Sequence, residues 1–251
     1  MASGMYAKPT DSAAWYRYSD PKTVLQGGLL FRGGDFEMAL CVSILSLVCF
    51  CILSVLELRF HQTDKEHFFK PLLMPVLIVF YLSSVSVSGR EIRYLLIPAL
   101  IGGFLGDTFL LREEYFIPGL LSFLAGHVFY IIDFWRNIKV SWLRPIPISV
   151  IFMIYFLYMI LVVQKLFPGM DPRAKAPVSL YIGVILAMSF SSYLMYMTGK
   201  TSGRMITWAG TMLFIASDTI LSFQVFHKKS GTWVMPTYLA AQFLIVLGAL
   251  M

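Results

Sequence analysis

The sequence predicts an all-α membrane protein, a polytopic helical bundle of about eight transmembrane helices. Of its 251 residues, 58% are hydrophobic and only 14% are charged, and the mean hydropathy is +0.73. Soluble domains carry about 25% charged residues. A helix needs about 20 mostly apolar residues to cross a hydrocarbon core of roughly 30 Å. Stretches of this kind cover most of the chain, so little is left for a soluble domain.

The apolar stretches divide the chain into a polar N-terminal extension, residues 1–37, and a transmembrane helical domain, residues 38–251. The extension lacks the pattern of a secretory signal peptide, and we expect it at the membrane surface. Short connections keep unsatisfied backbone out of the lipid, so chemistry must take place between helices. The expected spans are residues 38–56, 71–88, 92–111, 116–135, 145–163, 177–197, 204–223 and 233–250.

A weak internal similarity suggests a four-plus-four repeat. Lys70 and Pro71 open the second span, as Lys175 and Pro177 open the sixth, and an aspartate follows in the third and the seventh spans. A duplication about an axis along the membrane normal would produce this pattern.

The net charge of +6 does not indicate a nucleic-acid partner, because the basic residues are scattered through the loops. They divide evenly between the two sides, so the positive-inside rule does not orient the bundle. Asp133 and Arg136, near a span end, are assigned to the membrane interface. Cys41, Cys49 and Cys51 share the first span, and we expect them to be buried packing residues.

Two aspartates, Asp107 and Asp218, lie deep in apolar stretches, each between a small residue and a threonine. A carboxylate in hydrocarbon is costly, so such residues indicate a functional site by default. At 1.5 Å per residue both lie roughly 21–22 Å from the same surface, just beneath the opposite headgroups. Gly102, Gly103 and Gly106 allow close helix approach or leave room for a ligand. The alternative is that both acids only fix helix packing.

Four further polar residues are candidates. His127 is the single histidine within a span, and a structural bond in the core explains it as well as a catalytic role. One histidine and two aspartates without a metal-binding motif predict no metal site. Lys70 suits a membrane-edge anchor or a phosphate ligand. Tyr238 and Gln242, one turn apart, share a face that we expect to point inward.

Five motifs follow one another in a fixed order: KPLLMP, FLGDTFLL, YFIPGLLSFLAGHVFY, GTMLFIASDTILSF and MPTYLAAQFLIVLG. This ordered set resembles the YhhN/TMEM86 family of integral membrane lysoplasmalogenases. The resemblance runs from about Lys70 to the C-terminal end and is weakest over residues 135–200. The N-terminal extension departs from the usual short start of the family.

The resemblance implies an eight-span bundle that hydrolyses the vinyl ether of lysoplasmalogens. The products would be a fatty aldehyde and a glycerophospho-ethanolamine or glycerophospho-choline. It implies a lysophospholipid substrate drawn from membrane lipids, with Asp107, Asp218 and His127 as catalytic candidates. The candidate substrate-binding residues are Lys70, Tyr130, Tyr238, Gln242, Thr108 and Thr219.

Paired carboxyls suit this chemistry. Cleavage begins with protonation of the β-carbon, and one carboxyl of a buried pair can keep a proton near neutral pH. Its ionised partner can stabilise the resulting cation and activate water. We favour Asp218 as the acid and Asp107 as the base, although the pair titrates as a unit. No cofactor is expected. Two other classes stay open: a cation- or proton-coupled transporter, and a bundle that binds a lipid without chemistry.

Overall fold

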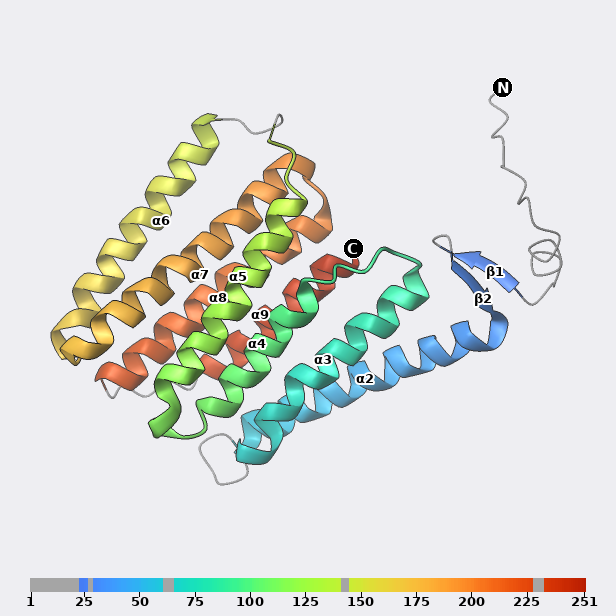
Figure 1. Cartoon of the computed structure of the whole chain (residues 1–251), viewed down its shortest axis with the longest axis horizontal. Coiled ribbons are helices and arrows are strands. Elements are labelled where there is room, and N and C mark those ends of the chain that lie inside the picture. The colour runs from blue at the N-terminus through green and yellow to red at the C-terminus, as the bar shows by residue number, and fades with distance from the viewer. Residues whose placement is uncertain (1–22, 27–28, 61–65, 141–144, 228–232) are drawn as a thin grey trace.

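The computed structural model describes residues 23–26, 29–60, 66–140, 145–227 and 233–251. These residues form eight α-helices, two short 3-10 turns and one antiparallel hairpin (Figure 1). The strands are β1 (Thr23–Gln26) and β2 (Leu29–Arg32). The helices are α2 (Gly33–Phe60), α3 (Glu66–Ser88), α4 (Leu96–Phe109), α5 (Phe116–Arg136), α6 (Pro145–Leu166), α7 (Pro172–Gly199), α8 (Ser202–His227) and α9 (Val234–Leu250).

The predicted all-α membrane bundle is confirmed. Six helices are long and apolar enough to cross a membrane, whereas α4 and α9 have 14 and 17 residues. The chain is therefore a multi-pass integral membrane protein. The hairpin lies within the segment expected to be an extension, and α2 begins at Gly33 within the same segment. The rest of that extension, residues 1–22, lies outside the described residues, and the four-plus-four repeat stays a prediction.

The helices differ in how much of each is covered by its neighbours. In the most apolar stretch of α7, 67% of the residues are buried, whereas 11% are buried in the corresponding stretches of α2 and α6. Figure 1 shows α6 at one edge of the bundle and the α2–α3 pair at the other. Helices α4, α5, α7, α8 and α9 lie between them, so the enclosed space in which a polar group can be shielded from lipid lies among these helices.

Glycines set the close approach of two helix pairs. A Cβ atom on Gly102 of α4 would lie 2.7 Å from the Gly126 Cα of α5. A Cβ atom on Gly248 of α9 would lie 2.3 Å from the Thr207 Oγ1 of α8. Neither pair could pack this closely with a larger residue, which is the packing expected of small residues between membrane helices.

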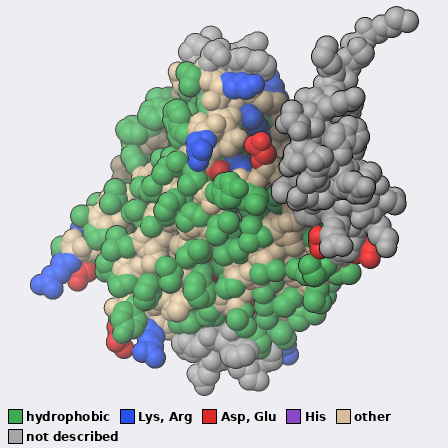
Figure 2. Space-filling view, turned by 45° about the vertical axis from the view of Figure 1, so that its right-hand side comes forward, with side chains coloured by type: hydrophobic (Ala, Val, Ile, Leu, Met, Phe, Trp, Pro, Cys, Tyr) green, Lys and Arg blue, Asp and Glu red, His purple; other side chains and the backbone are tan. Residues whose placement is uncertain are grey.

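Figure 2 shows hydrophobic side chains across the middle of one face, with charged side chains toward its ends. The outer surface of α2 includes two of its cysteines, since Cys41 and Cys51 are exposed and Cys49 is half-buried. The expectation that all three are buried is wrong. Helix α2 is apolar on every side and peripheral, so its pattern does not reveal which side turns inward.

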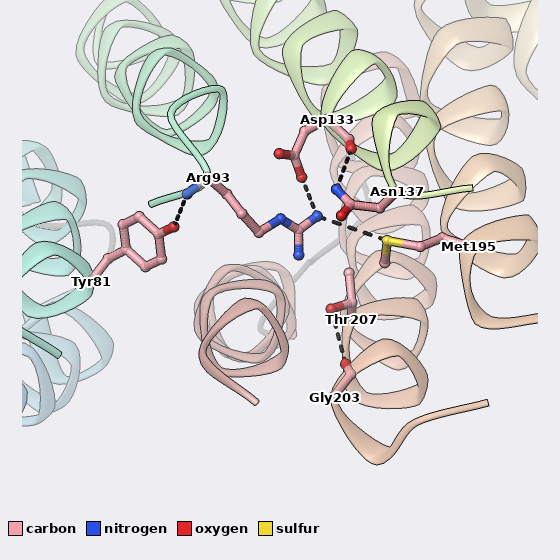
Figure 3. Close-up of polar contacts among 7 residues, drawn as sticks. All are labelled: Tyr81, Arg93, Asp133, Asn137, Met195, Gly203 and Thr207. Atoms are coloured by element: carbon pink, nitrogen blue, oxygen red, sulfur yellow. Dashed lines mark hydrogen bonds and ion pairs between the residues drawn. The ribbon is translucent and has the colours of Figure 1, made fainter. Parts of the chain in front are cut away.

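An ion pair ties the beginning of α4 to the end of α5 (Figure 3). The Arg93 guanidinium donates to Asp133, whose side chain is 5% exposed, and also lies 3.8 Å from Met195 Sδ of α7. The Arg93 amide donates a 2.8 Å hydrogen bond to the hydroxyl of Tyr81 on α3. Asp133 is thus buried in the bundle near the end of α5, and its place at the membrane interface stays a prediction. These contacts also explain why α4 begins later than the expected span.

Candidate active site

A cavity of about 850 Å³ opens between the beginning of α3 and helices α4, α5, α7, α8 and α9. Asp107 and Asp218 both lie in its wall, together with Lys70, Tyr181 and Tyr238. Its volume falls in the range of about 300–1,000 Å³ that is usual for small-molecule sites. The structure thus brings to one cavity two acids that lie on α4 and α8, far apart in the sequence.

Asp107 lies near the end of α4 and is 2% exposed. The Tyr238 hydroxyl on α9 donates a hydrogen bond of 2.7 Å to Oδ2 of Asp107. Phe123 packs edge-on against the Tyr238 ring, with 6.0 Å between centroids. A Cβ atom on Gly106 would lie 2.4 Å from the Phe123 ring, so the ring can lie beside Asp107 only because residue 106 is a glycine.

Asp218 lies on α8 and accepts a hydrogen bond at Oδ2 from the hydroxyl of Tyr181 on α7. The same hydroxyl lies 3.4 Å from Nε2 of His127 on α5. The His127 ring packs edge-on against Phe214 at 4.8 Å and bonds the backbone of Phe123, one turn earlier. His127 therefore reaches Asp218 through Tyr181, and it lies behind the cavity wall.

Tyr130 and Gln242 form a polar contact deeper in the bundle. The Tyr130 hydroxyl donates a 2.8 Å hydrogen bond to Gln242 Oε1, and both residues are buried. A Cβ atom on Gly103 would lie 3.2 Å from Gln242 Nε2 and 3.5 Å from the Tyr238 hydroxyl. The pair thus lies beneath Tyr238 rather than in the cavity wall, where it supports the tyrosine that bonds Asp107.

The two threonines that follow the aspartates do not line this cavity. The exposed Thr108 donates to the Phe104 carbonyl at 2.8 Å, and Thr219 donates to the Ile215 carbonyl at 2.7 Å. Successive residues on a helix point about 100° apart. An inward aspartate therefore turns the next residue toward a neighbouring surface.

Two cations lie at the end of the bundle where the cavity opens. Lys70 is half-buried near the beginning of α3, and Arg112 is exposed in the turn after α4. Lys70 was a candidate from the sequence, whereas Arg112 and Tyr181 were not. Tyr181 is one of several tyrosines and serines in α7, so the sequence did not single it out. Among the described residues, no group of three or more His, Cys, Asp and Glu side chains could hold a metal ion.

Comparisons with known proteins identify related sequences. The model of the YhhN family matches residues 65–249. The chain is similar to the Homo sapiens protein named Lysoplasmalogenase TMEM86B, with 32% identity over 181 residues, 70% of this chain and 73% of that protein. It is 30% identical to the Rattus norvegicus protein of the same name over 183 residues, 70% of each chain. No solved structure gives a significant match.

Proposed function

Because the chain belongs to the YhhN family, we propose that it hydrolyses the vinyl ether of lysoplasmalogens at the cavity between Asp107 and Asp218. The relatives named lysoplasmalogenase support this choice of substrate. The observation that carries the proposal is the meeting of two intramembrane carboxyls on one cavity of about 850 Å³. Such a cavity can take a lipid with a single chain, while the carboxyls supply the proton chemistry that vinyl ether cleavage requires.

In the proposed reaction, Asp218 is the general acid. Its proton goes to the β-carbon of the vinyl ether, and the electrons of the double bond form the new C–H bond. The positive charge that remains is shared by the α-carbon and the ether oxygen, next to the ionised carboxylate of Asp107. Fixed charges aimed at developing charge are a principal source of catalysis, so Asp107 stabilises the cation where it forms.

Water then adds to the α-carbon and loses one proton to a carboxylate, which gives a hemiacetal. The hemiacetal collapses as the ether oxygen takes a proton and leaves with the glycerol group, while the new hydroxyl loses its proton and becomes the aldehyde. The same carboxyls can give and take these protons in turn, as paired carboxyls do in glycoside hydrolysis. The proposed cycle requires no cofactor.

The hydrogen bonds of Tyr181 allow Asp218 to act as the general acid. Its hydroxyl carries one proton and lies between Asp218 and His127, with 3.4 Å to the histidine Nε2. When Asp218 is ionised, Tyr181 donates to it. When Asp218 is protonated, Tyr181 can accept from it and donate to His127 instead, so both states of the acid are hydrogen-bonded. Buried polar groups are costly when they are left without partners.

Lys70 and Arg112 are proposed to bind the phosphate of the substrate. Both line the cavity, and they lie where it meets the end of the bundle. Hydrogen bonds from a charged donor to phosphate are about twice as strong as neutral ones. With the phosphate held there, the vinyl ether reaches the carboxyls a few bonds deeper, and its chain lies between Phe116, Leu120 and Phe226.

The test is aldehyde release by purified wild-type protein from a lyso-alkenyl phosphoethanolamine, beside its saturated alkyl analogue and with or without a chelator. The proposal expects aldehyde from the alkenyl lipid only, at a rate that the chelator does not change. The alkyl ether has no double bond to protonate and is the matched negative substrate. Well-folded protein that releases no aldehyde would contradict the assignment. Transport lost in Asp→Asn variants would then favour a transporter.

A further inference from the structure

A second, much smaller cavity adjoins Asp218 and shares part of its wall with the main cavity. It has a volume of about 20 Å³ and lies between α6, α7 and α8. Tyr158, Thr219 and Ser222 supply hydroxyl groups to its wall. Asp218, Tyr181 and Ser222 line both cavities, so the space of lipid size and this side cavity meet at the proposed acid.

We propose that the side cavity binds the water molecule consumed by the hydrolysis and supplies it to Asp218. This inference rests on the proposed function. A water molecule needs about 10–15 Å³ of cavity and two to four polar partners. The side cavity, at about 20 Å³, meets the size requirement and is far smaller than the main cavity of about 850 Å³.

The hydroxyl groups beside the cavity leave oxygen lone pairs free for such a ligand. Thr219 donates its proton to the Ile215 carbonyl at 2.7 Å, so in its 2.5 Å contact with Tyr158 it is the acceptor. Ser222 donates its proton to the backbone carbonyl of Asp218 at 2.7 Å. Each of these hydroxyl protons is therefore already donated, and only the hydroxyl oxygens remain to accept further hydrogen bonds. A small neutral molecule with two hydrogens to donate suits this set.

Asp218 supplies the acceptor that matters for the chemistry. Tyr181 bonds its Oδ2, and within the described ranges no hydrogen bond to its Oδ1 is found. A water that donates one hydrogen to this carboxylate and the other to a hydroxyl oxygen has its own lone pairs free. A carboxylate bonded to water in this way is placed to act as a general base.

The position of this water gives Asp218 two successive roles. Transfer of its proton to the β-carbon leaves Asp218 ionised, next to the water and to the new cation. The water oxygen then bonds to the α-carbon while its O–H proton passes to Asp218, which restores the acid. The hemiacetal formed has gained one water in all, and the proton given in the first step has been replaced. Asp107 needs only to stay ionised.

The experiment has one readout of water and one of catalysis. Hydroxyl-radical footprinting in H₂¹⁸O labels tyrosines that have water beside them, and Tyr196, which is half-buried as Tyr158 is and lines neither cavity, is the internal reference. In parallel, Val162→Leu adds one methylene to the wall of the side cavity. Val163→Leu, at the next position of α6, is the matched control. Tyr158→Phe keeps the volume and removes a hydroxyl, so it serves if the larger side chain does not fold.

We expect ¹⁸O label on Tyr158 well above that on Tyr196, and a fall of the Tyr158 label to the Tyr196 level in Val162→Leu. We also expect kcat to fall about tenfold in Val162→Leu and in Tyr158→Phe with KM unchanged, since one hydrogen bond is worth about that factor. Label on Tyr158 no higher than on Tyr196, or unchanged kcat in both folded variants, would overturn the water site. Absence of aldehyde from the wild-type protein would instead contradict the proposed function, and the footprint would still decide whether water is bound.

Discussion

The hydroxyl of Tyr181 donates to Asp218 and lies within 3.4 Å of the His127 imidazole, so one tyrosine links the candidate acid to a histidine of α5. The contact joins α8 to α5 through α7, the most deeply buried helix of the six candidate spans. Because His127 lies behind the wall, any influence on the lipid must pass through this hydroxyl. Tyr181 is therefore a positioning residue in the proposed mechanism.

Tyr181→Phe is expected to lower kcat about 10- to 100-fold with little change in KM, because a hydrogen bond to a charged group contributes about 1.5–3 kcal/mol. The measurement is steady-state aldehyde release from a lyso-alkenyl lipid. Tyr193→Phe is the matched control, since that ring packs on Trp208 at 5.2 Å elsewhere on α7. Equal kcat values in the two variants would remove Tyr181 from the mechanism.

Lys70→Met and Arg112→Met are expected to raise KM for a phosphate-bearing substrate, each by about tenfold, with kcat nearly unchanged. Each removes one of the cations that line the cavity and keeps both aspartates, and a charge-assisted bond to phosphate is worth about this factor. An alkenyl glycerol without phosphate is the discriminating substrate. Its KM should be the same in wild type and variants, and a parallel rise would show that the cations do not bind phosphate.

Asp133→Asn is expected to destabilise the protein by about 3–5 kcal/mol, because it leaves the Arg93 guanidinium partly buried without its counter-ion. The measurement is thermal unfolding in detergent, with kcat determined per folded molecule at low temperature. The rate should stay close to wild type, since the ion pair lies at the other end of α4 from Asp107. Replacing both residues by methionine should restore part of the stability. No loss of stability in Asp133→Asn would show that the pair is not a structural tie.

Gly102→Ala and Gly183→Ala form a matched pair of helix substitutions. The new Cβ on Gly102 would lie 2.7 Å from the Gly126 Cα, whereas a Cβ on Gly183 meets no atom within 4 Å. Thermal unfolding should show Gly102→Ala less stable by about 1–3 kcal/mol, since backbone must move. Gly183→Ala should be neutral or more stable by about 0.5–1 kcal/mol, because alanine suits a helix better than glycine. A reversed order would contradict the close α4–α5 packing.

Much of the fold follows from the sequence because apolar stretches bounded by prolines and charges define membrane helices directly. Side-chain direction is harder to predict in the most apolar elements. Helix α2 presents apolar residues on every side, so periodicity could not place Cys41 and Cys51 on its outer surface. The partner of Asp133 was missed for a different reason. Arg93 is not its sequence neighbour, and only the packing of α4 on α5 brings the two together.

The candidate site was predictable where it contains residues that are energetically costly inside a membrane, because such residues usually have a function. Two carboxylates in apolar stretches are expensive, so Asp107 and Asp218 stood out, and the structure places both on one cavity. Tyr181 carried no such signal, since a tyrosine is tolerated in a membrane span at little cost. Thr108 was predicted as a site residue because it follows Asp107. Adjacent residues of a helix face different sides, however, and the Thr108 hydroxyl bonds a carbonyl of its own helix.

The central claim is that the two aspartates perform the chemistry together, and aldehyde release by Asp107→Asn and Asp218→Asn tests it most directly. General acid–base groups contribute about 10²–10⁴-fold, so each variant should lose at least about a hundredfold in kcat while it still binds the lipid. Asp171→Asn is the matched control, because this exposed aspartate caps α7 by accepting from the Arg173 amide and asparagine caps equally well. Wild-type kcat in either cavity variant, with Asp171→Asn also unchanged, would contradict the paired-aspartate mechanism.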